Sequence, residues 1–258
     1  MTGAALLAEI DSEPALHPRL WWLGHAGFAI KFRNIVVYVD PHLSGPGSLL
    51  DPATVTHADL ILSTHPHPHH LDGDTLRPML AASPRAKLVL PKSAAEAART
   101  LGIPYERMTT TDAGLRIEYF RLGEYLRVYA VPSAHPELAH TPLGGYPNLG
   151  YVIRCGGSTI YHAGDGIPYE TLADRLKPYT VTIALVPFDG RANGNFTVEE
   201  AAQISEQIGA HWLAPMHYGL LPGTPGDASA FVDHLLFHRP AQRFKVFTPG
   251  EGWTAPED

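Results

Sequence analysis

Hydrophobic residues near the start of the chain fall into three short runs separated by turn residues. Residues 19–23, 28–32 and 35–39 are rich in aromatic and β-branched side chains, which favour strands. Residues 1–18 contain Pro14 and Pro18, and we interpret them as a short helical or irregular N-terminal lead. The pattern therefore predicts that the chain begins, after this lead, with a β-meander.

Further along, short hydrophobic runs alternate with helical patterns. Strands are expected at residues 60–62, 87–90, 116–120, 126–131, 149–154, 158–162, 181–186, 212–215 and 244–247. Helices are expected at residues 74–82, 94–101, 169–176, 197–207 and 227–237. Two of them begin with the spacing of a capping box, Ser93 with Glu96 and Thr197 with Glu200. This order fits an α+β fold in which two sheets lie face to face with helices outside, and we interpret residues 1–258 as a single domain with αββα layers.

Composition and charge narrow the classes of function. A chain of 258 residues with 45% hydrophobic and 17% charged residues can bury a sizeable core. Its net charge of −7 disfavours a nucleic-acid partner. No apolar run approaches the roughly 18 residues of a membrane span, and the first residues lack the basic start of a signal peptide. The lack of these segments and the single Cys155 favour a cytoplasmic protein without a membrane partner. The sequence is also compatible with a homo-oligomer.

Four histidines lie within six residues, directly after the predicted strand at residues 60–62: His65, His67, His69 and His70. The two prolines between them favour extended backbone in the residue that precedes each, so His65 and His67 should point to the same face. Neutral imidazole is a favoured ligand of zinc and similar ions. The segment therefore predicts a site for one or two metal ions, and a solvated histidine tract is the alternative.

Three further candidate ligands each follow a predicted strand: His135, Asp165 and His217. Side chains at strand ends can converge at one edge of a sheet, so these residues and the histidine segment are expected to form one site. Taken one at a time, each also has an ordinary interpretation, Asp165 as a turn residue and the histidines as hydrogen-bonded side chains.

The series His65-x-His67-x-His69-His70, followed by His135, Asp165 and His217, resembles the HxHxDH-His-Asp-His series of the metallo-β-lactamase superfamily. The match is most similar to the L-ascorbate-6-phosphate lactonase-like branch. The stretches that carry this closer likeness are residues 22–28, 40–44, 161–165, 189–191, 194–197, 200–201 and 215–218. The resemblance implies a four-layer αββα sandwich of the metallo-β-lactamase type, with a metal site at one edge of the two sheets.

The resemblance also implies a two-metal site. His65, His67 and His135 would hold the first ion, and Asp165 would bridge both ions. His69, His70 and His217 would hold the second ion. The superfamily has Asp where this chain has His69, and an imidazole does not offset the charge of the two cations. Fewer carboxylates favour zinc, iron or nickel over manganese, whereas the resembled lactonases are manganese-dependent. The cofactor expected is therefore one or two divalent ions, zinc or manganese.

The expected function is a metal-dependent hydrolase of a small, anionic substrate, with a sugar lactone (phosphate) as the first candidate. A bound divalent ion can lower the pKa of water to roughly 7 and supply a nucleophile at neutral pH. A phosphodiesterase that acts on cyclic nucleotides or phospholipid-type diesters is one alternative. A metal-binding protein in which His69 has ended catalysis is another.

Further residues are given candidate roles from their neighbours in the sequence or from the resemblance. Asp165 and His69 are expected in the catalytic centre. Asp72 is a candidate to orient the attacking water molecule there, or to cap the next helix. Arg191 and Asn195 are candidates to bind a phosphate or carboxylate, or belong to a solvated loop. Histidines at three further positions are candidates for substrate contact or turn packing: His25, His42 and His162. Asp40, before Pro41, is expected to form a turn or to support a ligand.

Overall fold

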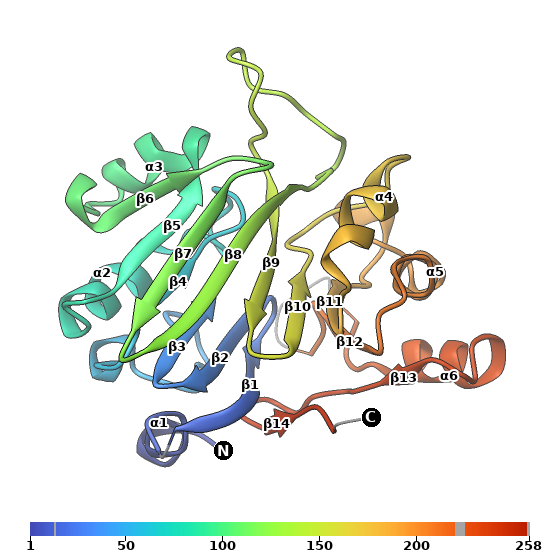
Figure 1. The fold of residues 1–258 in the computed structure, drawn as a ribbon, viewed down its shortest axis with the longest axis horizontal. Coiled ribbons are helices and arrows are strands. Elements are labelled where there is room, and N and C mark those ends of the chain that lie inside the picture. The colour runs from blue at the N-terminus through green and yellow to red at the C-terminus, as the bar shows by residue number, and fades with distance from the viewer. Residues whose placement is uncertain (13, 220–224, 257–258) are drawn as a thin grey trace.

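The computed structural model describes residues 1–12, 14–219 and 225–256. Within these residues the chain forms two seven-stranded sheets that lie face to face, with helices outside them (Figure 1). The strand order of the first sheet is β14 (Gly252–Thr254), β1 (Ala15–Gly24), β2 (Gly27–Arg33), β3 (Ile35–Val39), β4 (Leu60–Leu62), β5 (Lys87–Pro91) and β6 (Met108–Thr111). The order of the second is β13 (Arg243–Phe244), β12 (Trp212–Met216), β11 (Ile183–Pro187), β10 (Ser158–His162), β9 (Leu149–Cys155), β8 (Glu124–Pro132) and β7 (Arg116–Arg121). The predicted αββα arrangement is confirmed.

Each sheet joins an antiparallel half to a parallel half. The antiparallel halves are β1–β3 and β7–β10, and the parallel halves are β3–β6 and β10–β13. Parallel neighbours need crossover connections. Helices lie in these connections: α2 (Gly73–Ala82), α3 (Ala95–Thr100), α4 (Leu172–Leu176), α5 (Val198–Ile208) and α6 (Ser229–His238). None of the helices in the described part of the chain is long and apolar enough to cross a membrane.

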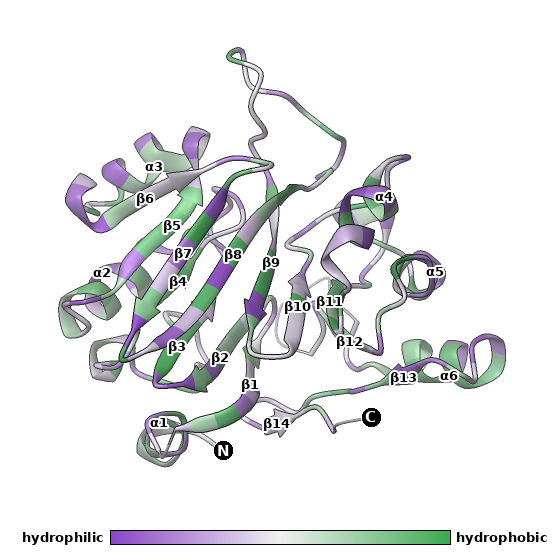
Figure 2. Cartoon of the chain, viewed as in Figure 1, coloured by the Kyte–Doolittle hydropathy of each residue, from purple (hydrophilic) through white to green (hydrophobic). Residues whose placement is uncertain are grey.

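The core has two layers because the first sheet is buried on both faces. In β1, Leu20 and Trp22 face the second sheet, whereas Trp21 and Leu23 belong to a separate cluster on the outer face. This alternation follows from the two-residue period of a strand. The outer cluster includes Leu6 of helix α1 (Gly3–Ile10) and residues of α2 and α3. In Figure 2, β5 is coloured as mainly hydrophobic, whereas β7 and β8 alternate between hydrophobic and hydrophilic residues.

One of the two predicted capping boxes is confirmed. The Thr197 side chain accepts from the backbone N–H of Glu200, and the Glu200 carboxylate accepts from that of Thr197. Gly209 ends α5 with a φ of 66°. The prediction at Ser93 was wrong. Residues 92–94 form a 3₁₀ turn and α3 begins at Ala95, so Ser93 already lies in a helical turn and not in the extended conformation that an N-cap requires.

The other corrections concern short elements. The strand expected at residues 244–247 is only Arg243–Phe244, and β14, which pairs with β1, was not predicted. Strand β6 was also missed. The helix expected at residues 169–176 begins only at Leu172. Elements of two to five residues are decided by the neighbours that they pair or pack with, which a local hydrophobic pattern does not contain.

Candidate metal centre

Segments from both sheets meet at one edge of the sandwich. His135 follows β8, Asp165 follows β10 and His217 follows β12, and the pairing registers bring these three strand ends to the same side of the second sheet. The histidine segment follows β4 of the first sheet, and the N–H of Leu149 in β9 donates to the carbonyl of Thr64 over 3.0 Å. The convergence expected from the sequence therefore occurs.

Two groups of potential ligands lie at this edge. In each group, one potential ligand atom from every residue lies within 4.8 Å of the others. The members of the first group are His65, His67, His135 and Asp165. The members of the second group are His25, His70 and His217. The second group lacks His69, which the sequence predicted, and contains His25, which the sequence assigned to substrate contact.

Asp165 belongs to the first group and also reaches the second. Its Oδ2 is 3.8 Å from His65 Nε2, 3.7 Å from His135 Nε2 and 3.3 Å from His70 Nε2. Its Oδ1 is 2.7 Å from His217 Nε2. One oxygen therefore faces both groups and the other faces the second, which is the arrangement that a carboxylate shared by two cations needs.

The chemistry of the donor atoms fits a bound cation. Five buried atoms lack a hydrogen-bond partner of suitable geometry: His25 Nδ1, His65 Nε2, His70 Nε2, His217 Nε2 and Asp165 Oδ1. Leaving one such atom unsatisfied costs about 1–3 kcal/mol, so several of them together at one place are unusual in a folded protein. Imidazole nitrogens and a carboxylate are also the ligand types of zinc and related ions, so the residues present fit one or two divalent ions.

The opposite nitrogen of most of these rings is held by a partner. His70 Nδ1 lies 2.8 Å from Asp40 Oδ2, and His217 Nδ1 lies 3.5 Å from Asp189 Oδ2. His135 Nδ1 donates to the carbonyl of Gly194 over 2.9 Å. Since an N–H held at Nδ1 leaves the lone pair at Nε2, these contacts orient each ring with its ligand atom toward Asp165.

Electrostatics in the protein without bound ions favour protons at His70 and His217 of the second group. Burial opposes the charged form of His70, but Asp165 and Asp40 overcome this effect and raise the pKa of His70 to about 10. Burial acts on His217 in the same way, and Asp165 and Asp189 raise its pKa to about 9. Burial would raise the pKa of Asp165, but His217 and His70 hold it well below its usual range. A cation that binds the second group must therefore displace protons.

Comparison with known proteins agrees with this geometry. The family described as "Beta-lactamase superfamily domain" matches residues 19–217. The chain belongs to the metallo-β-lactamase superfamily. It is 31% identical to a UPF0173 metal-dependent hydrolase of Aeropyrum pernix, over 91% of this chain and 96% of that one. It is 32% identical to another from Methanopyrus kandleri, over 91% and 99%. A metallo hydrolase of Ignicoccus hospitalis has the same fold, with a TM-score of 0.74 and 21% identity over 93% of this chain and 99% of that one.

His69, the position at which this chain departs from the superfamily series, lies outside both ligand groups but next to the second, with its ring centroid 5.5 Å from that of His25. Its side chain is exposed, and its ring packs edge-on against that of His42, with 4.8 Å between the ring centroids. The N–H groups of His70 and Leu71 both donate to the carbonyl of His67, over 2.9 Å and 2.8 Å. This tight turn carries His70 inward and His69 outward. His69 is therefore a member of neither group, and its ligand role stays a prediction.

Asp72 caps helix α2, which is one of the two roles considered for it. Its carboxylate accepts from the N–H of Asp74 over 3.0 Å, and from the hydroxyls of Ser44 and Thr75. It also lies 3.0 Å from His42 Nδ1. Burial would raise the pKa of Asp72, but these hydrogen bonds hold it well below the usual range. Asp72 thus fixes His42, which in turn packs against His69 near the ligand groups.

His162 does not face the ligand groups. It is fully buried, its Nε2 lies 2.8 Å from the carbonyl of Ala26, and its Nδ1 accepts from the N–H of Gly164 over 3.2 Å. Both ring nitrogens are engaged, so none remains for the predicted substrate contact. The ring instead ties the β1–β2 turn to the segment that carries Asp165.

Arg191 and Asn195 also have partners in the protein. Arg191 pairs with Glu200 in the first turn of α5, with Nε 3.1 Å from Oε1. Asn195 is buried. Its Oδ1 accepts from the N–H of Gly166 and its Nδ2 donates to Asp189 Oδ1, both over 2.8 Å. Asn195 therefore supports the segment after Asp165 and the carboxylate behind His217. Asp189 was not predicted as a site residue, although residues 189–191 belong to the stretches that carry the resemblance.

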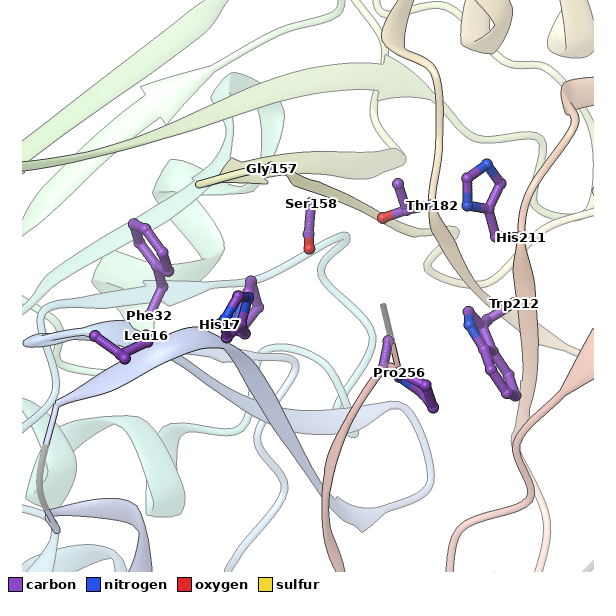
Figure 3. Close-up of a pocket in the computed structure, with 11 residues that line it drawn as sticks. Leu16, His17, Phe32, Gly157, Ser158, Thr182, His211, Trp212 and Pro256 are labelled. Atoms are coloured by element: carbon purple, nitrogen blue, oxygen red, sulfur yellow. The ribbon is translucent and has the colours of Figure 1, made fainter. Parts of the chain in front are cut away.

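A cavity of about 250 Å³ lies elsewhere, near the opposite ends of the strands (Figure 3). It is lined by the beginnings of β1 and β12 and by the β9–β10 turn, including Leu16, Ser158 and Trp212. The described residues that line it include no carboxylate, and no group of potential ligands lies there. The groups suited to bind a metal ion therefore lie at the edge that carries Asp165.

Proposed function

We propose that the protein hydrolyses a small anionic ester at the centre around Asp165, with a sugar lactone (phosphate) as the first candidate substrate. The observation that carries the proposal is the position of the Asp165 carboxylate between two groups of imidazoles, in which the buried Nε2 atoms of His65, His70 and His217 lack a hydrogen-bond partner of suitable geometry. The UPF0173 relatives, which are named metal-dependent hydrolases, support the reaction class.

Two divalent ions fit the two groups. The first would be held by His65, His67 and His135, the second by His70 and His217, and Asp165 would contact both. A bound divalent ion lowers the pKa of a water molecule to roughly 7 and polarises a carbonyl or phosphoryl oxygen. The role of the protein's own residues is to present Nε2 atoms without protons, through the contacts at Nδ1, and to keep the Asp165 carboxylate charged. Imidazoles far outnumber carboxylates among these ligands, so we propose zinc in preference to manganese.

The distribution of charge supports an anionic substrate. Asp165 is the one carboxylate within the ligand groups of the described residues. Asp40 and Asp189 lie behind the imidazoles of His70 and His217, on the side away from Asp165. The exposed side of the centre presents His67 and His69. With cations bound, the potential on that side is positive, which attracts a carboxylate or a phosphate.

The test is a substrate panel on protein loaded with Zn²⁺ or with Mn²⁺. Sugar lactones and their phosphates are compared with bis-p-nitrophenyl phosphate and cyclic nucleotides. We expect lactone opening that is lost with a chelator and in Asp165→Ala, which removes the shared carboxylate. Hydrolysis of diesters alone would replace the lactonase proposal with a phosphodiesterase. A protein that binds metal but hydrolyses nothing in the panel would be a metal-binding protein without this activity.

A further inference from the structure

We propose that His25 takes the place that the superfamily gives to the carboxylate at position 69, and completes the second metal site with His70, His217 and Asp165. The inference rests on the proposed metal centre, but not on its substrate. It adds a ligand from the β1–β2 turn of the first sheet to a site that is otherwise formed by residues following β4, β10 and β12.

The position of the ring is the first argument. The His25 ring centroid lies 3.7 Å from that of His217 and 5.3 Å from that of His70. His25 is 7% exposed, and its Nδ1 is buried without a hydrogen-bond partner. A histidine that served only as packing would be expected to satisfy this nitrogen or leave it to solvent. In His25 this nitrogen has neither a hydrogen-bond partner nor contact with solvent.

The backbone of the turn is the second argument. His25 has a φ of 52° and His217 a φ of 69°, both in the left-handed region that non-glycine residues seldom adopt. The carbonyl of His25 accepts from the N–H of His217 over 3.1 Å and from Nε1 of Trp22 over 3.0 Å. Two histidines in costly conformations are thus tied directly to each other. Such strain persists where the surroundings over-determine it, and it concentrates at functional sites.

A third contact fixes the next residue of the turn. His162 Nε2 lies 2.8 Å from the carbonyl of Ala26, and the same ring accepts the N–H of Gly164 next to Asp165. His162 thereby sets the distance between the His25 turn and the shared carboxylate. No comparable contact holds the His69 ring, whose neighbours within the described residues are the rings of His25 and His42.

The experiment counts the metal ions bound to the chain of 258 residues. Protein stripped with a chelator is dialysed against Zn²⁺ and analysed for bound zinc, and the visible spectrum of the Co²⁺-loaded protein reports its coordination. The variants are His25→Asn and His25→Asp, because both residues tolerate the left-handed conformation. Asn keeps the turn but is a poor ligand, whereas Asp restores a carboxylate. His69→Ala is the matched control in the histidine segment.

We expect two ions per chain in the wild type, in His25→Asp and in His69→Ala. In His25→Asn we expect the second ion to bind roughly 100-fold more weakly or to be absent, since loss of a direct ligand should exceed the 10–100-fold effect of losing a supporting residue. Two tightly bound ions in His25→Asn, or loss of an ion in His69→Ala, would overturn the proposal, as would a wild type that binds only one. Inactivity toward the whole substrate panel with these counts intact would refute the proposed function and leave the role of His25 standing.

Discussion

The Asp40 carboxylate lies 2.8 Å from Nδ1 of His70, on the side of the ring opposite Asp165. Asp40 is fully buried, has a φ of 43°, and also accepts from the N–H and the hydroxyl of Thr64 over 2.8 Å and 2.7 Å. It therefore connects the end of β3 with the start of the histidine segment, and it holds a proton on Nδ1 of His70, so that Nε2 is the nitrogen that can bind a cation.

Asp40→Asn is expected to weaken metal binding by about 10–100-fold, the usual effect of losing a carboxylate behind a ligating histidine. Asn tolerates the left-handed backbone at this position, so the fold should be kept. Affinity is measured by competition with a chelating dye. Asp72→Asn is the control, because it alters a carboxylate near the centre that contacts His42 and not a ligand, and Asn remains a good N-cap. Equal losses in both variants would show that Asp40 has no special relation to the site.

Metal binding should release protons at neutral pH. His70 and His217, with pKa values of about 10 and about 9 in the ion-free protein, are protonated at pH 7 and must lose these protons to bind a cation. Affinity for the second ion should therefore rise steeply from pH 7 to 9 and level off above about pH 10. Calorimetry in buffers of different ionisation enthalpy measures the released protons. An affinity that does not vary between pH 7 and 9 would contradict the assignment of His70 and His217 to that ion.

Most of the candidate site could be predicted because its residues follow buried strands. His135, Asp165 and His217 each come directly after a hydrophobic run, and such runs are visible in the sequence. The side-chain direction of His69 could not be predicted, since it depends on the turn in which His70 and Leu71 both bond to the carbonyl of His67. Spacing alone suggests that neighbouring histidines share one site.

The partners of the ligands were harder to predict than the ligands. Asp189 acts on His217 from a loop 28 residues earlier, and His25 approaches from the other sheet. Such contacts depend on how the two sheets are placed against each other. The same limit applies to the prediction of the fold. The long strands were predicted from their hydrophobic runs, whereas β14 forms because it pairs with β1.

The ion-free protein should lose stability as the pH rises from about 6.5 to 10. The pKa values of His70 and His217 are raised above the ordinary histidine value of 6.5. Their contribution to stability is therefore complete below pH 6.5 and is lost as the pH passes through the folded-state values of about 9 and about 10. Thermal unfolding of chelator-treated protein between pH 6.5 and 8.5 measures this loss. Zn²⁺-loaded protein is the control and should show a smaller slope, because its ligands no longer carry protons. Parallel curves for the two forms would argue against protonated imidazoles in the ion-free centre.

Gly164→Ala should disturb the shared carboxylate through the backbone. Gly164 has a φ of +64°, and an added Cβ would lie 2.9 Å from the carbonyl oxygen of Leu149 and 3.0 Å from Cβ of Thr64. Both the backbone conformation and the lack of space oppose a side chain, so we expect a loss of more than about 1 kcal/mol in stability. Because Asp165 is the next residue, metal affinity should fall as well.

Gly157→Ala is the matched control for this substitution. Gly157 lies in the β9–β10 turn at the opposite end of β10, and an added Cβ there meets nothing within 4 Å. Chemical denaturation and zinc competition are measured on both variants. We expect Gly157→Ala to match the wild type in both measurements. If Gly164→Ala lost stability but bound zinc as tightly as the wild type, the position of Asp165 would not depend on the close approach of the two sheets at Gly164.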